Sequence, residues 1–215
     1  MDWMEIFTLV TGVVYIYLEV RQKNFMWIVG LVTSAAAVYV FTDRGLYATA
    51  ALNVYYLAVS FWGLYQWRHD SHILGNKDSA GEAGNGMGKD VGKEAKEGRD
   101  KEDEIHLRHL TARTAIVSAI VYCVTTALLV FLMEKTGDPM SFLDAVVTVL
   151  GAVGTWWLSR SYKEQWLLWI VADILTVVMC LMQDMYYMSA LYLVYTASAV
   201  YGYFHWKRRG TYVSD

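Results

Sequence analysis

Charged side chains are scarce in this chain of 215 residues. Asp, Glu, Lys and Arg occupy 18% of the positions, whereas a soluble domain carries them at roughly a quarter of its positions. The uncharged stretches reach the ~20 residues that a helix needs to cross a hydrocarbon layer about 30 Å thick. The sequence therefore predicts a membrane protein with several spans.

Other absences exclude whole classes of protein. No stretch alternates apolar and polar residues as barrel strands do, so the spans are expected to be helices. No phosphate-binding G-x-x-x-x-G-K-[ST] motif occurs, which argues against an ATP-driven pump. No span carries the mid-depth lysine of a retinal protein or the Ser/His and metal-ligand sets of a membrane hydrolase. We therefore expect no enzymatic activity, no cofactor and no binding of nucleic acid.

Cysteines and histidines offer little for a metal site. The chain has two cysteines, Cys123 and Cys180, in different predicted spans, and we interpret both as buried thiols that pack as small apolar groups. Two histidine pairs have a spacing that chelates metal on a helix, but no Cys or third ligand accompanies them, so we interpret them as solvated. These pairs are His69-x-x-His72 and His106-x-x-His109.

Seven apolar stretches are long enough to be spans. The N-terminus MDWMEIF lacks the basic residues of a cleaved signal peptide, so the first stretch is expected to remain. The predicted spans are Trp3–Leu18, Phe25–Phe41, Leu46–Trp67, Ala115–Met133, Phe142–Leu158, Trp166–Met182 and Tyr186–Trp206.

Basic residues predict the orientation of these spans. With the N-terminus outside, 16 Lys and Arg residues lie in inner segments, and the two outer ones are Arg44 and Lys135. Because inner loops carry the excess of Lys and Arg, the N-terminus is expected outside and the C-terminus inside.

The segment 69–113 interrupts the apolar pattern. It contains GNKDSAGEAGNGMGKDVGKEAKEGRDKEDE and has almost no large apolar side chains. Such a sequence buries too little surface to offset its ordering entropy, so we expect a flexible charged cytoplasmic loop. Near its end, KEDEIHLRHL is expected to form a short helix.

The two halves of the chain resemble each other. When residues 6–67 are shifted by 139 positions onto residues 145–206, 14 of 62 residues match without a gap. The matches include Gly12 with Gly151, Arg21 with Arg160, Trp27 with Trp166, Tyr47 with Tyr186, Gly63 with Gly202 and Trp67 with Trp206. We interpret this as a duplicated unit of three helices.

A fourth, linking span makes the two units parallel. The predicted fold is an all-α integral membrane protein of seven transmembrane helices in a 3+1+3 arrangement, a plan known among transporters. The predicted parts are a first repeat (1–68), the charged loop (69–113), a linking helix (114–139), a second repeat (140–209) and a cytoplasmic tail (210–215).

One face of the sixth span carries the candidate site. Trp166, Trp169 and Asp173 are spaced i, i+3 and i+7 in WLLWIVADIL, so they share a helical face. A carboxylate in mid-span usually faces a cavity or a partner, and no span holds a basic residue at that depth. A cationic aromatic ligand would fit, since tryptophan faces attract cations. Two alternatives are an interfacial belt role for Trp166 and a protonated Asp173 bonded to a neighbouring helix.

The third and seventh spans add polar groups. Asn53 and Tyr56 lie on one face of the third span, and Tyr192 occupies the position equivalent to Asn53 in the second half. We take these three as candidate ligand contacts, although such residues also join helices to one another. Gly63 and Gly202 are expected to be close-packing points.

The chain resembles the PnuC family of vitamin-precursor transporters. The resemblance rests on YKEQWLLWIVADILTVV (162–178), FWGLYQW (61–67) and MSALYLVYTASAVYGYFHW (188–206), and covers both repeats. It implies a 3+1+3 fold, a homotrimer, and facilitated diffusion of a B-vitamin precursor across the bacterial inner membrane, with trapping by a separate cytoplasmic kinase. By this resemblance Trp166, Trp169 and Asp173 match the substrate-binding motif, and Asn53 and Tyr56 match a binding face.

Nicotinamide riboside is the cargo that the resemblance favours. Family members that carry it tend to have Asn where this chain has Asp173 and Gln where it has Asn53, so thiamine stays the alternative. From another class, a membrane sensor or scaffold would use the charged loop to bind a cytoplasmic partner.

Overall fold

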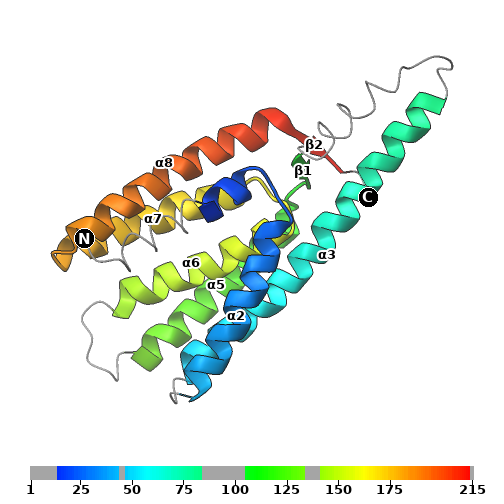
Figure 1. Ribbon diagram of the computed structural model, residues 1–215. Coiled ribbons are helices and arrows are strands. Elements are labelled where there is room, and N and C mark those ends of the chain that lie inside the picture. The colour runs from blue at the N-terminus through cyan, green and yellow to red at the C-terminus, as the bar shows by residue number, and fades with distance from the viewer. Residues whose placement is uncertain (1–13, 44–46, 84–104, 134–140, 214–215) are drawn as a thin grey trace. The chain divides into compact units, whose positions relative to one another are not determined.

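The computed structural model describes residues 14–43, 47–83, 105–133 and 141–213 (Figure 1). Residues 14–20 are helical. The other elements are α2 (Phe25–Asp43), α3 (Tyr47–Ala83), β1 (Ile105–Leu107), α5 (Ala112–Met133), α6 (Ser141–Ser159), α7 (Gln165–Met182), α8 (Tyr186–Arg209) and β2 (Gly210–Tyr212).

The helices follow the predicted spans. The starts of α2, α6, α7 and α8 lie within one residue of the expected positions, and α3 and α8 both begin with a tyrosine. Among the described residues, three stretches are long and apolar enough to cross a membrane: Ala112–Leu132, Phe142–Ser159 and Gln165–Met182. The first predicted span lies largely outside the described residues.

Two expectations for the segment 69–113 are wrong. The helix of the third span does not end at Trp67 but continues as α3 to Ala83. Just beyond Trp67, Ser71 Oγ donates to the Trp67 carbonyl at 2.8 Å. KEDEIHLRHL does not form a helix: residues 105–107 form strand β1, whose Ile105 and Leu107 are each 1% exposed. Burial of both side chains and pairing with β2 outweigh local helix propensity here.

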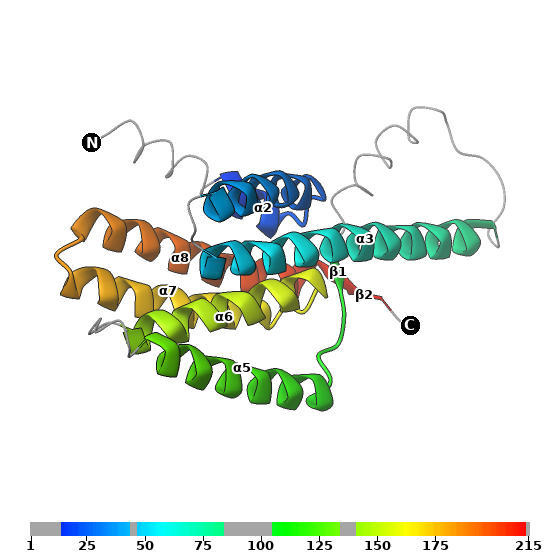
Figure 2. The same ribbon diagram turned by 90° about the horizontal axis from the view of Figure 1, so that it is seen from below.

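The chain divides into two compact units. The described part of the first comprises residues 14–16, 109–133, 141–158 and 162–205. Figures 1 and 2 both show its helices α5, α6, α7 and α8 side by side in this order. Trp157 Nε1 donates to Ser118 Oγ at 3.0 Å and joins α6 to α5. Van der Waals contact between Trp169 and Gly154 joins α6 to α7.

The second unit comprises residues 17–108, 159–161 and 206–215. Its centre is a cluster of buried tryptophans. The Trp67 ring lies edge-on to the Trp27 ring and to the Trp206 ring, with centroid distances of 5.1 and 6.4 Å. These three side chains are at most 1% exposed. Trp27 also packs on Gly63, where an added Cβ would lie 2.5 Å from the indole ring, so α2 and α3 touch at backbone distance.

Three turns between helices share one conformation. Gln22, Ser161 and Asp184 have positive φ angles of 50°, 58° and 57°. In each turn the next N–H bonds to the carbonyl five residues earlier, which is the pattern of a Schellman helix end. These bonds are Lys23 to Leu18 (2.9 Å), Tyr162 to Trp157 (3.1 Å) and Met185 to Cys180 (2.8 Å).

Residues 105–108, which we name the strap, are held from two sides. On one side β1 pairs in parallel with β2, with Ile105 opposite Gly210 and Leu107 opposite Tyr212. On the other side the Gln22 carboxamide replaces a neighbouring strand: its Nε2 donates to the His106 carbonyl at 2.9 Å, and its Oε1 accepts from the His106 N–H at 2.6 Å. The strap therefore has no open strand edge at His106.

Side chains of α3 fix the strap further. Arg108 donates to both carboxylate oxygens of Asp70, at 2.8 and 3.2 Å, and Asp70 is fully buried. Gln66 donates to Asp70 at 3.0 Å and is also buried. His106 Nε2 lies 2.8 Å from Ser71 Oγ, and burial lowers the pKa of the His106 imidazole, opposed by the nearby Asp70.

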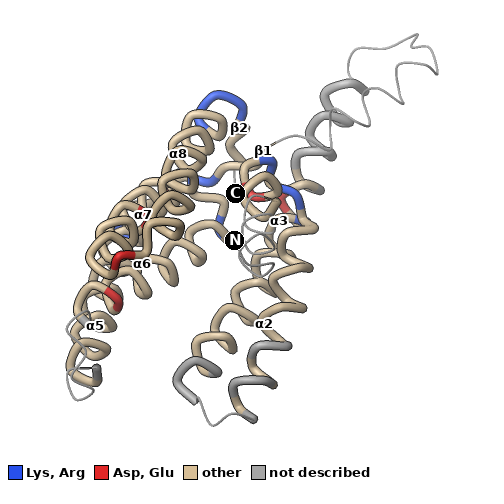
Figure 3. Tube along the Cα trace, turned by 60° about the vertical axis from the view of Figure 1, so that its left-hand side comes forward, with Lys and Arg blue, Asp and Glu red and all other residues tan. Residues whose placement is uncertain are grey.

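Basic residues gather near the strap. The Lys and Arg residues of the second unit that Figure 3 colours blue lie around β1, β2 and the adjoining turns. Arg160 also stacks over the Trp62 ring at 5.2 Å. These basic residues gather where α3 passes the strap, near Asp70.

The cysteines differ in their surroundings. Both are free thiols, and Cys180 is buried as expected. Cys123 is exposed on α5, so the expectation of burial is wrong for this residue. The α5 surface around it is apolar and exposed, with Ile120 and Val124 58% and 64% exposed, as on a helix that faces hydrocarbon.

Candidate functional site

The candidate site is built on α7, which starts directly after the turn at Ser161. The Gln165 and Trp166 N–H groups bond to the Tyr162 and Lys163 carbonyls, so the helix begins with a tight turn. From this start, helical periodicity brings Trp166, Trp169 and Asp173 toward one side of α7.

Trp166 is a packing residue. Its side chain is 2% exposed, and a Cβ added to Gly202 would lie 2.7 Å from the indole ring. The interpretation of Trp166 as an interfacial belt residue is therefore wrong, since belt residues face the headgroup region. Gly63 and Gly202 are confirmed as close-packing points, each under a tryptophan.

Trp169 lies in looser packing. Its ring is 3.4 Å from a Cβ built on Gly154, which is ordinary van der Waals contact, and the side chain is half-buried. Its Nε1 is buried and has no hydrogen-bond partner among the described residues. The indole N–H is therefore available to an acceptor that the described chain does not supply.

Asp173 is 7% exposed in the middle of α7. Within the described part of the chain it forms no ion pair with Lys, Arg or His. Its carboxyl acts electrostatically on the hydroxyls of Tyr192 and Tyr195 of α8. The rings of these two tyrosines lie 5.6 Å apart. A buried carboxylate without a cation is costly, so the site favours a positively charged partner.

The first unit thus holds four of the predicted site residues: Trp166, Trp169, Asp173 and Tyr192. Asn53 and Tyr56 belong to α3 of the second unit. Both are half-buried, and the Tyr56 ring lies 5.5 Å from that of Tyr55. In their own unit they occupy the α3 face that also holds Ser60, which is 5% exposed.

The described residues contain no group of three His, Cys, Asp or Glu side chains that could hold a metal ion. His106, one of the histidines with chelating spacing, lies in strand β1 and contacts Ser71. The chelating arrangement requires a helix, so the strand removes it.

Sequence comparison gives the family. The profile described as nicotinamide mononucleotide transporter matches residues 2–208, nearly the whole chain. The chain belongs to the nicotinamide mononucleotide transporter family. The PnuC resemblance expected from the α7 and α8 motifs is confirmed.

Similar proteins agree with this family. The chain is 24% identical to the nicotinamide riboside transporter PnuC of Neisseria mucosa, over 96% of this chain and 73% of the relative. It is 23% identical to the PnuC of Escherichia coli, over 96% of this chain and 85% of the relative. The crystal structure of the vitamin B3 transporter PnuC has a TM-score of 0.62 at 23% identity, covering 96% of this chain and 81% of that one.

Family membership makes this a multi-pass membrane transport protein. All of these relatives are named transporters rather than enzymes. The likeness to the solved PnuC transporter supports the all-helical fold.

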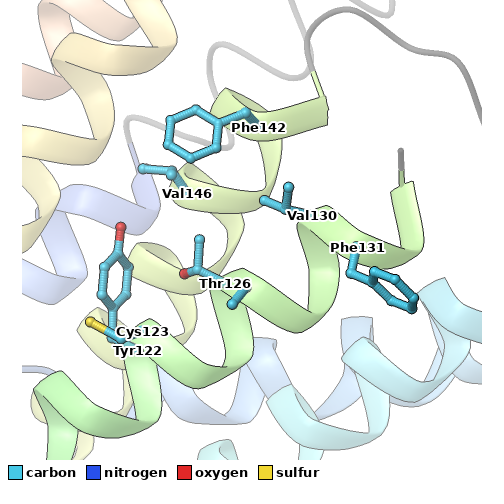
Figure 4. A pocket seen from close by; sticks show the side chains of 8 residues that line it. Tyr122, Cys123, Thr126, Val130, Phe131, Phe142 and Val146 are labelled. Carbon is cyan, nitrogen blue, oxygen red and sulfur yellow. The ribbon is translucent and has the colours of Figure 1, made fainter. Parts of the chain in front are cut away.

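An apolar groove lies elsewhere in this family member. It has a volume of about 510 Å³ and opens between α5 and α6 (Figure 4). Tyr122, Thr126 and Phe142 are among its lining residues, and none of the predicted site residues lines it. The groove carries no charged side chain, so it does not offer the electrostatics of the α7 site.

Gln165 was not identified as a site residue from the sequence. It stands beside Trp166 in the YKEQW motif and is fully buried. Neither atom of its amide has a hydrogen-bond partner among the described residues. The signal available in the sequence was its spacing: Gln165 precedes Trp169 by four residues and Asp173 by eight.

Proposed function

We propose that this protein is a facilitative transporter that carries nicotinamide riboside across the bacterial inner membrane. The observation that carries the proposal is the buried Asp173 carboxylate, which has no cationic partner in the described chain. Nicotinamide riboside has a pyridinium ring, whose positive charge a carboxylate would neutralise. The similar proteins from Neisseria mucosa and Escherichia coli are named as transporters of the same compound.

The surroundings of Asp173 suit an aromatic cation. Trp169 offers a ring face for stacking and cation–π attraction. Its unpartnered N–H and the hydroxyls of Tyr192 and Tyr195 offer hydrogen bonds to polar substituents. In this proposal Trp166 mainly fixes α7 against α8, and Asn53 and Tyr56 stay candidate contacts on the strength of the family resemblance alone.

The proposal includes the 3+1+3 duplication. Equivalent residues 139 positions apart have equivalent structures: Gln22 and Ser161 both have positive φ, and the Trp27–Gly63 contact corresponds to the Trp166–Gly202 contact. The turn hydrogen bonds from Lys23 and Tyr162 also correspond. Parallel repeats of this kind support transport by alternating access, with a site between the halves near mid-membrane.

The transport mode is proposed to be passive. Asp173 is the single carboxylate among the candidate site residues. A carrier coupled to protons or sodium usually holds more than one buried ionisable group. A passive carrier only equilibrates its substrate, so a separate cytoplasmic kinase would trap the vitamin by phosphorylation. The basic residues near the strap support an inner location for the strap and the part of α3 beside it.

The proposal also includes a homotrimer with the N-terminus outside. The exposed apolar residues of α5 offer surface for lipid or a second copy. Mass measurement of the detergent-solubilised protein would distinguish a trimer from a monomer.

Binding titration of the purified protein tests the proposed cargo. Nicotinamide riboside should quench tryptophan fluorescence, and vesicles containing the protein should take up labelled substrate without an ion gradient. Asp173→Ala should abolish both, whereas Ser34→Ala should not: Ser34 holds the equivalent position in the first half and is also 7% exposed. Quenching by thiamine alone would make thiamine the cargo. Loss of function on deleting residues 75–100 would favour a sensor or scaffold, whereas the transporter proposal expects near-normal uptake.

A further inference from the structure

Gln165 combines complete burial with an unused amide. Its side chain is 0% exposed, and both its Nε2 and its Oε1 are buried without a hydrogen-bond partner among the described residues. A carboxamide buried in this way loses its hydrogen bonds to water and gains nothing in return. Its main-chain N–H is already used by the Tyr162 carbonyl, so only the side chain is available.

The Gln165 amide lies in line with the candidate site. Gln165, Trp169 and Asp173 are spaced i, i+4 and i+8, so they follow one face of α7 over about 12 Å at 1.5 Å per residue. Each carries a polar group that the described chain leaves unused: an amide, an indole N–H and a carboxylate without a cation. All three lie in the same compact unit.

The first half of the chain shows that packing does not require this amide. The position equivalent to Gln165 is Met26, whose side chain is also 0% exposed. Trp169 and Asp173 correspond to Gly30 and Ser34. An unbranched apolar side chain therefore fills this position in one repeat, and the row of three polar groups occurs in the other.

We propose that Gln165 determines specificity by binding the hydroxyl-bearing sugar of the transported cation. This inference rests on the proposed function: Asp173 and Trp169 take the cationic ring, and the carboxamide one turn before Trp169 takes the sugar. A carboxamide both donates and accepts, which matches a pair of neighbouring sugar hydroxyls. Because Gln165 is enclosed here, the sugar reaches it in the conformation that opens this part of the site.

The test compares two ligands that share the ring cation. Nicotinamide riboside carries the sugar, and 1-methylnicotinamide carries a methyl group in its place. In titrations of the full-length protein followed by tryptophan fluorescence, Gln165→Met should weaken nicotinamide riboside binding about tenfold, the effect of losing one or two hydrogen bonds. The affinity for 1-methylnicotinamide should stay unchanged.

Two further variants serve as controls, one for the position of the amide and one for folding. Met26→Gln places the amide at the equivalent position of the first half and should change neither affinity. If Gln165→Met does not fold, as judged by gel filtration in detergent, Gln165→Leu gives the same ratio of affinities.

Three results would overturn the inference. Equal affinity of Gln165→Met and the unsubstituted protein for nicotinamide riboside would make the amide irrelevant. An equal loss for both ligands would make it a structural residue. If the unsubstituted protein binds neither ligand, the proposed function itself fails. This result differs from the first two, in which the unsubstituted protein still binds nicotinamide riboside and only the role of Gln165 is rejected.

Discussion

Gln22 donates its side-chain N–H to the hydroxyl of Ser161 at 3.1 Å, and the two residues are 139 positions apart. That interval is the one that relates the two halves of the sequence. Trp67 and Trp206, also 139 apart, contact each other through their rings. Contacts between equivalent residues are what the proposed duplication predicts near a two-fold axis.

The first prediction separates the two tryptophans of α7. Trp166→Ala should destabilise the protein by about 3–5 kcal/mol, because it empties a fully packed position against Gly202. Trp169→Ala should cost less stability, since the ring is half-buried, but should abolish the fluorescence response to nicotinamide riboside. Thermal unfolding in detergent and ligand titration measure the two effects. The reverse pattern would make Trp166 the ligand contact.

A second prediction concerns the glycine under Trp166. Gly202→Ala should destabilise the protein by about 1–3 kcal/mol, because a Cβ there would overlap the indole ring and force it to move. Gly154→Ala is the matched control: its Cβ would lie 3.4 Å from the Trp169 ring and should be tolerated. Thermal unfolding of both variants measures the difference. Equal stability of the two variants would contradict the packing described here.

A third prediction concerns the ion pair of the strap. Arg108→Ala leaves the fully buried Asp70 without its cation and should cost about 3–5 kcal/mol. Lys163→Ala is the matched control. It removes an ion pair with Glu164, 4.0 Å long and between partly exposed side chains, and should change stability by no more than about 0.5 kcal/mol. Unfolding midpoints measure both. The double variant Asp70→Leu/Arg108→Leu should recover much of the loss, and failure to recover would show that the arginine acts otherwise than through Asp70.

A fourth prediction follows from the buried imidazole of the strap. Burial lowers the pKa of His106, so the unfolded chain binds this proton more readily than the folded one. Stability should therefore decrease as the pH falls below about 6.5, the unfolded value, and should be fully present above it. Hydrogen exchange of residues 105–108 at pH 5.5 and 7.5 measures the effect. His106→Gln should remove the His106 share of this dependence, and an unchanged profile in that variant would assign it to other groups.

The sequence predicted the starts of α2, α6, α7 and α8 to within one residue, because a long apolar stretch bounded by polar residues marks each helix. Its repeat also pointed to Gly63 and Gly202, since only a side chain of minimal size fits beneath a tryptophan. The strand at Ile105–Leu107 could not be predicted, because its partners lie far away, at Gln22 and in the C-terminal strand. The intrinsic propensities of residues 105–107 depend on their own side chains and carry no information about such distant contacts.

Two site residues illustrate the same limit. Trp166 and Trp169 look alike in the sequence, but their roles depend on what lies opposite them, a tight contact with Gly202 or a looser one with Gly154. Gln165 looks like an interfacial polar residue at the start of a span. Its complete burial depends on the neighbouring helices and so requires three dimensions.

The strap also determines where the chain can change in length. The bonds between Asp70 and Arg108 close a loop across 38 positions, so both ends of the intervening chain are fixed to the same part of α3. The entropy of closing a loop rises only with the logarithm of its length, by about 0.6 kcal/mol per doubling. Insertions or deletions within residues 84–104 therefore leave the helices in register, and this segment is the natural place to attach a tag or a label.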